Sequence, residues 1–223
     1  MKKIALPFLL TAFLLLAATV AYTQETESSY RGSVQADIKL TKKLHWMVEP
    51  EYRFGNDNDS RSLLLQTGLN YRLTSWLNIG AYYRMQGAWT KDAEQNDVTS
   101  FEFYNRFAFD ANTKIRLSRF TPKFRVRFCN FSDFDSQTDD KSNYLRYRAG
   151  LSYNIKGLAL TPSVSAEWYE KLDSGSWNKV RYSVGLAYAI NKNNAISMEY
   201  SRDEKFKSET GYNIFEVSYK IGF

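Results

Sequence analysis

The chain has 223 residues, a net charge of +6, one cysteine and an aromatic content of 16%. Its single cysteine, Cys129, excludes an internal disulfide. The basic residues alternate with apolar ones instead of clustering, so no nucleic-acid partner is expected.

The N-terminal segment has the pattern of a secretory signal peptide. Met1-Lys-Lys3 precedes an apolar run over 4–16, and small residues follow over 17–21. The run is shorter than the roughly 20 residues of a membrane-spanning helix. We expect residues 1–23 to be removed, with cleavage somewhere from 21 to 24, and residues 24–223 to form a single β-barrel domain.

Apolar and polar residues alternate with a period of two through the rest of the chain, which predicts β-strands. The clearest case is 101–117, where odd positions from Phe101 to Leu117 are mostly apolar and argue against a hairpin at Asn112. Pro50 is expected at a bulge or an incompletely paired position. We predict eleven strand segments: 30–40, 44–54, 63–73, 77–89, 101–117, 123–128, 144–155, 158–170, 180–190, 195–201 and 212–223.

Short turns and longer polar loops alternate strictly between these segments. This asymmetry is typical of transmembrane β-barrels, which have short periplasmic turns and longer outer loops. Bacterial single-chain barrels have even strand numbers. We therefore expect an all-β, antiparallel transmembrane β-barrel of 10–12 strands. Twelve is favoured, with 24–29 as an additional strand or threaded segment, and ten is possible.

The number of apolar side chains indicates which face points outward. Five or six per segment give roughly sixty, whereas a filled barrel interior holds on the order of a dozen. The apolar face is therefore predicted to contact lipid and the charged face to line the lumen. A soluble two-sheet sandwich is the alternative.

The last segment resembles the closing strand of bacterial outer-membrane barrels, because Tyr219, Ile221 and the terminal Phe223 share its apolar face. The resemblance implies an assembly signal made of these three residues and a periplasmic C-terminus. It also implies the barrel-assembly machinery, outer-membrane lipid and lipopolysaccharide as partners.

The mature chain as a whole resembles an uncharacterised outer-membrane β-barrel family of Gram-negative bacteria, of the domain-of-unknown-function 2490 type. The resemblance lies in the motifs Glu49-Pro-Glu-Tyr-Arg-Phe54, Asn105-Arg-Phe107, Arg125-Val-Arg-Phe128, Leu145-Arg-Tyr-Arg148 and Pro162-Ser-Val-Ser-Ala-Glu-Trp168, and in the closing Phe. It implies a fold and an outer-membrane location, and it supplies no catalytic or binding residues.

Basic residues outnumber acidic ones on the face predicted to line the lumen. Those on three consecutive segments could form a basic track that resembles the arginine ladders of channels for acidic oligosaccharides: Arg116, Lys123, Arg125, Arg127, Arg146 and Arg148. Guanidinium groups suit carboxylates. The alternative is a hydrated lumen filled by ion pairs.

Catalytic and metal-binding patterns are weak. The lone histidine, His45, is expected to be a lumen or rim residue, and the acidic loop with Asp133, Asp135, Asp139 and Asp140 lacks calcium-loop spacing. We expect no cofactor, no metal and no enzymatic activity. A structural or interaction role is the first hypothesis, a narrow anion-preferring channel for small acidic solutes or oligosaccharides the second, and an outer-membrane hydrolase the third.

Overall fold

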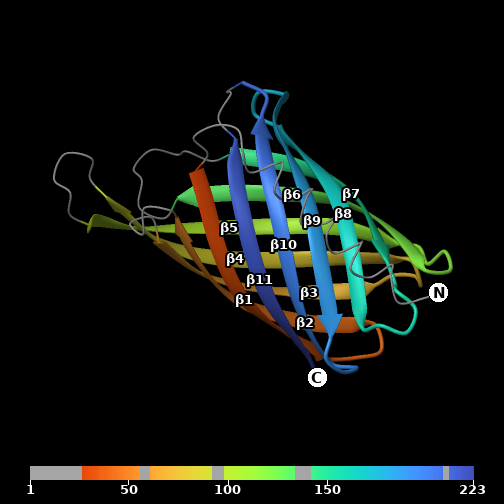
Figure 1. Ribbon diagram of the computed structural model, residues 1–223. Coiled ribbons are helices and arrows are strands. Elements are labelled where there is room, and N and C mark those ends of the chain that lie inside the picture. The colour runs from red at the N-terminus through yellow and green to blue at the C-terminus, as the bar shows by residue number, and fades with distance from the viewer. Residues whose placement is uncertain (1–26, 56–60, 92–97, 134–141, 208–210) are drawn as a thin grey trace.

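The computed structural model describes residues 27–55, 61–91, 98–133, 142–207 and 211–223. Eleven strands form one closed barrel (Figure 1). No helix in these ranges is both long enough and apolar enough to span a membrane. The strands are β1 (Glu27–Lys39), β2 (Leu44–Gly55), β3 (Arg61–Arg72), β4 (Leu77–Lys91), β5 (Val98–Lys114), β6 (Phe120–Asp133), β7 (Ser142–Tyr153), β8 (Leu160–Lys171), β9 (Ser176–Ala189), β10 (Asn194–Lys205) and β11 (Tyr212–Gly222).

The barrel closes through one parallel pair. Every other neighbouring pair is antiparallel, but β1 runs parallel to β11 from Glu27↔Tyr212 to Asp37↔Gly222, and Figure 1 shows the red first strand beside the dark blue last one. The predicted range of ten to twelve strands is confirmed, whereas the favoured twelve and the wholly antiparallel order are wrong. Residues 27–29 extend β1 instead of forming another strand, so the first and last of eleven strands point the same way. Residues 24–26 lie outside the described ranges.

The two faces of the wall have the predicted polarity. Along β5, Phe107 and Phe109 are 48% and 56% exposed, whereas Ala108 and Asp110 are 2% and 6% exposed. Val126 and Leu151 are also exposed. The apolar face therefore points away from the axis, and the sandwich alternative is rejected.

The two rims differ in their connections. Five turns join strands at one end, here called the turn rim, at 40–43, 73–76, 115–119, 154–159 and 190–193. Gly157 and Ser118 adopt positive φ angles of 78° and 56° in two of them. The opposite end, the loop rim, includes 172–175, which is as short as the turns, so the strict length alternation is wrong there. The reason is that β8 extends to Lys171 and β9 begins at Ser176, within residues predicted to be loop.

Two local predictions, for β5 and for Pro50, are confirmed. β5 is one long strand without a hairpin at Asn112. Pro50 pairs with Leu65 of β3, but the β1–β2 register is interrupted between Ser33↔Glu51 and Ala36↔Val48. Pro50 therefore sits at an incompletely paired position, as its missing amide hydrogen requires.

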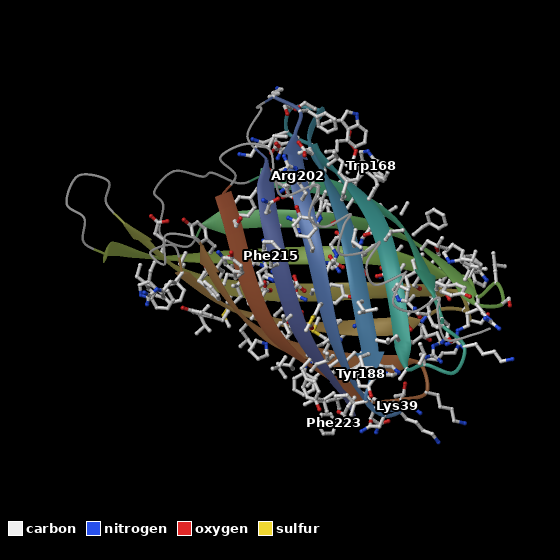
Figure 2. All side chains as sticks on the ribbon, viewed as in Figure 1. Lys39, Trp168, Tyr188, Arg202, Phe215 and Phe223 are labelled. Atoms are coloured by element: carbon white, nitrogen blue, oxygen red, sulfur yellow. The ribbon has the colours of Figure 1, made fainter. Side chains whose placement is uncertain are left out.

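Exposed aromatic side chains form two bands on the outer face. The band near the turn rim contains Trp46, Tyr71, Trp76, Phe120, Tyr188 and Phe223, and the band near the loop rim contains Tyr30, Tyr52, Phe101, Phe103, Trp168 and Phe215. Figure 2 shows Tyr188 and Phe223 toward one end and Trp168 toward the other. Such paired girdles mark the two membrane interfaces in outer-membrane barrels.

Candidate functional site in the barrel lumen

The lumen contains a highly charged cavity on the side of the loop rim, with a volume of about 750 Å³. We call it the loop-side cavity. Its basic lining residues are Arg31, Arg53, Arg84, Arg106, Arg125, Arg127, Arg146, Arg148, Lys179 and Arg181, and its acidic ones are Glu49, Glu51, Glu167, Glu199 and Glu216. Two further carboxylates, Asp110 and Asp203, pair with Arg127, Lys179 and Arg181 of this lining. Ten cations therefore face seven carboxylates, and the excess of positive charge makes this space attractive to anions.

A second cavity of about 610 Å³, the turn-side cavity, occupies the other half of the lumen. Its basic lining includes Lys43, Arg72, Lys114 and Lys220 near the turn rim. The two cavities share a set of residues that we call the middle belt: Glu49, Arg84, Arg125 and Arg127. The belt therefore lies where one cavity passes into the other.

Ion pairs and hydrogen bonds hold the middle belt in place. Arg84 donates to Gln66 at 2.9 Å and lies 3.4 Å from Glu51, and Gln66 donates to Glu49 at 3.2 Å. Arg127 forms an ion pair with Asp110, whose side chain is fully buried. Groups fixed in this way are preorganised.

The predicted basic track is divided between lumen and rim. Register pairs Arg125 with Arg148 and Arg127 with Arg146 across β6 and β7, and all four line the loop-side cavity. Lys123 faces Gly150 on β7 and is exposed. Arg116 lies in the 115–119 turn, also exposed.

Carboxylates accompany the four luminal arginines of the track. Glu167 accepts hydrogen bonds from Arg125 at 2.7 Å and from Arg146 at 2.8 Å. Arg148 lies 3.2 Å from Glu199. The cations therefore stand in an ion-paired network, and their use as a path for anions stays a prediction.

The sequence did not predict a cluster of charged side chains around Tyr169. Lys179 and Arg181 both bind Asp203 at 2.5 Å, and Arg146 donates to the Tyr169 hydroxyl at 2.8 Å. The Arg146 guanidinium also lies 4.5 Å from the centre of that ring. Residues 202–211 were predicted to be a loop, but β10 extends to Lys205 and turns Asp203 inward. The available signal was that Asp203 continues the alternation of Glu199 and Ser201.

His45 lies in the turn-side cavity, on the predicted face. Its Nδ1 is 2.8 Å from Asp37 Oδ1, and Asp37 also lies 3.1 Å from Lys220. Within the described ranges this is the only side-chain hydrogen bond of His45. His45, Asp37 and Lys220 thus form a polar cluster toward the turn rim.

The described residues contain no group of three or more potential metal ligands. Asp135, Asp139 and Asp140 of the acidic loop lie outside the described ranges, and so does the predicted signal peptide. Of Asp133 only the backbone, at the end of β6, is described.

The closing strand is paired along both edges. Tyr219 faces Val34 on β1 and Ile196 on β10, and the Phe223 amide donates to the Asp37 carbonyl at 2.9 Å. Phe223 is 71% exposed on the outer face. The role of Tyr219, Ile221 and Phe223 as an assembly signal stays a prediction.

An apolar outer face, two aromatic bands and a charged lumen define an outer-membrane type of β-barrel. The family model described as "Protein of unknown function (DUF2490)" matches residues 32–213. The chain belongs to this family.

A solved structure of another protein shares the barrel fold. The β domain of the Bordetella autotransporter BrkA superposes with a TM-score of 0.52 at 13% identity, over 83% of this chain and 86% of that one, which shows a shared fold alone. An anion-selective porin from Comamonas acidovorans gives a TM-score of 0.37 at 10% identity, over 78% and 55% of the chains, too low to support an argument. No curated protein matches the sequence.

Proposed function

We propose that this protein is an outer-membrane barrel whose lumen binds small anions and lets them pass. The observation that carries the proposal is the excess of cations at the loop-side cavity, where ten basic side chains outnumber five carboxylates of the lining and the two aspartates, Asp110 and Asp203, that pair with it. An excess of one sign of charge in a narrow lumen raises the local concentration of ions of the opposite sign. Guanidinium groups bind carboxylates through paired hydrogen bonds, so small acidic solutes are the proposed class.

In this proposal each part of the lumen has a separate task. Lys43, Arg72, Lys114 and Lys220 attract anions at the turn rim, and the cations of the loop-side cavity attract them from the other end. The middle belt is the selectivity step between the cavities. Its arginines already have partners, so a solute competes with them and leaves again.

Planar-bilayer conductance tests the proposal. Refolded protein in a salt gradient should give a reversal potential of anion-preferring sign. Arg125→Glu with Arg146→Glu should shift that potential toward cations, because both side chains line the loop-side cavity. Arg202→Glu is the matched control, since Arg202 does not line either cavity and pairs with Glu204 at the loop rim. Absent conductance, or a cation preference that the double variant leaves unchanged, would contradict conduction and leave the structural or interaction role.

Outer-membrane location is part of the same proposal. The apolar outer face and the closing strand support insertion by the barrel-assembly machinery into a membrane of phospholipid and lipopolysaccharide. Fractionation of cells should place the protein in the outer membrane with residues 1–23 removed. Recovery in the periplasm as folded protein would contradict it.

A further inference from the structure

The turn rim carries basic side chains almost exclusively. The five turns contain no Asp or Glu. Eleven basic residues in or beside them are exposed: Lys39, Lys42, Lys43, Arg72, Lys114, Arg116, Arg119, Lys123, Lys156, Lys192 and Lys220. The nearest carboxylate side chain on β1 is Asp37, which is held by His45 and Lys220. This end of the barrel is therefore strongly positive.

Eight of these eleven cations fall into two sets with different positions. The mouth set, Lys43, Arg72, Lys114 and Lys220, lines the turn-side cavity and belongs to the proposed path for anions. The turn set, Lys42, Arg119, Lys156 and Lys192, comes from four of the five turns and does not line either cavity. None of the turn set forms an ion pair within the described ranges. The lumen therefore does not account for the turn set.

Each member of the turn set has an exposed apolar neighbour within two residues. Leu40 precedes Lys42, Leu117 and Phe120 flank Arg119, Leu158 follows Lys156 and Ile190 precedes Lys192, and all five apolar side chains are at least 41% exposed. Figure 2 shows another cation and apolar side chain, Lys39 and Phe223, close together at this end. An apolar side chain beside a cation suits the boundary where acyl chains meet headgroups.

We propose that the turn set binds the headgroups of anionic phospholipids in the leaflet from which the hairpin turns emerge. The apolar neighbours would enter the acyl region while the cations reach the phosphates. A cell-wall polymer would use the charges but not the apolar side chains, which favours the lipid. Cations on four separate turns also suit a ring of lipid around the barrel better than one partner at a single face. This inference does not depend on conduction through the lumen.

Lipid selectivity measured by electron spin resonance tests the proposal. The refolded mature protein is reconstituted in phosphatidylcholine vesicles with trace spin-labelled phosphatidylglycerol or phosphatidylcholine. We expect phosphatidylglycerol to associate with the barrel about fivefold more strongly, the effect of about one cation on a headgroup. The variant Lys42→Gln, Arg119→Gln, Lys156→Gln, Lys192→Gln should lower the ratio to about one, whereas matching substitutions in the mouth set should preserve it.

Three outcomes would overturn the proposal. They are equal association of both lipids with the unmodified protein, a preference that survives the turn-set variant, and a preference lost only in the mouth-set variant. Binding to purified peptidoglycan that requires the turn set, without lipid preference, would assign these cations to the cell wall instead. If the fourfold variant does not refold, the two double variants Lys42→Gln, Arg119→Gln and Lys156→Gln, Lys192→Gln should each reduce the ratio.

Discussion

Glu167 offers the sharpest test of how the lumen handles charge. The residue is 2% exposed, and its carboxylate accepts hydrogen bonds from Arg125, Arg146 and the Tyr169 hydroxyl. The substitution Glu167→Gln keeps the shape of the side chain and removes one negative charge. Arg146 retains its 2.8 Å bond to Tyr169, so Arg125 loses most.

The substitution should change two quantities, the free energy of unfolding and the anion-to-cation permeability ratio. Removing one partner of a buried ion pair costs about 3–5 kcal/mol, and we expect about 3 kcal/mol because Arg125 and Arg146 line an open cavity. Removing the charge of Glu167 lowers the electrostatic energy of an anion roughly 8 Å from that side chain. The decrease is on the order of 0.5 kcal/mol if the lumen screens like water and about 2 kcal/mol at an effective dielectric constant of about 20. Because about 1.4 kcal/mol is a tenfold change, the anion-to-cation permeability ratio should rise at least about twofold.

Two assays separate these effects. Urea unfolding of the refolded barrel gives the loss of stability, and the bilayer reversal potential gives the permeability ratio. Glu170→Gln is the matched control, because Glu170 lies on the outer face of the same strand and accepts a 3.0 Å hydrogen bond from Tyr147. A folded Glu167→Gln barrel with an unchanged ratio, or one shifted toward cations, would refute the reasoning.

The remaining predictions concern packing, pairing and assembly. Gly68→Ala should cost about 1–3 kcal/mol of unfolding free energy in urea, because its Cβ would stand 2.7 Å from a backbone carbonyl oxygen, whereas Gly32→Ala, with open space around it, should cost less. Arg127→Gln leaves the buried Asp110 carboxylate without its ion-pair partner and should cost about 3–5 kcal/mol of unfolding free energy in the same assay. Arg202→Gln breaks only an ion pair with Glu204 at the rim and should cost at most about 1 kcal/mol. Equal losses in the two variants would contradict the burial argument. Phe223→Ala should reduce the fraction of heat-modifiable barrel recovered in outer-membrane fractions, and unchanged recovery would count against the assembly signal.

Sequence alone determined which side chains face outward. A period of two admits only two arrangements, and the apolar set was too large for the interior, so the positions of Phe107 and Val126 followed from counting. The turn between the predicted segments 144–155 and 158–170, which contains Gly157, and the incomplete pairing at Pro50 also followed, because each depends on the local chemistry of one residue.

Tertiary structure decided how the strands meet and which charges pair. The parallel contact between β1 and β11 joins the two ends of the chain, and no local pattern encodes such a pairing. Likewise Glu167 binds Arg125, which lies two strands away on β6, and Asp203 came from a predicted loop. A strand's own residues fix its two faces, but the partner of a luminal charge depends on register and barrel curvature, which only the closed structure sets.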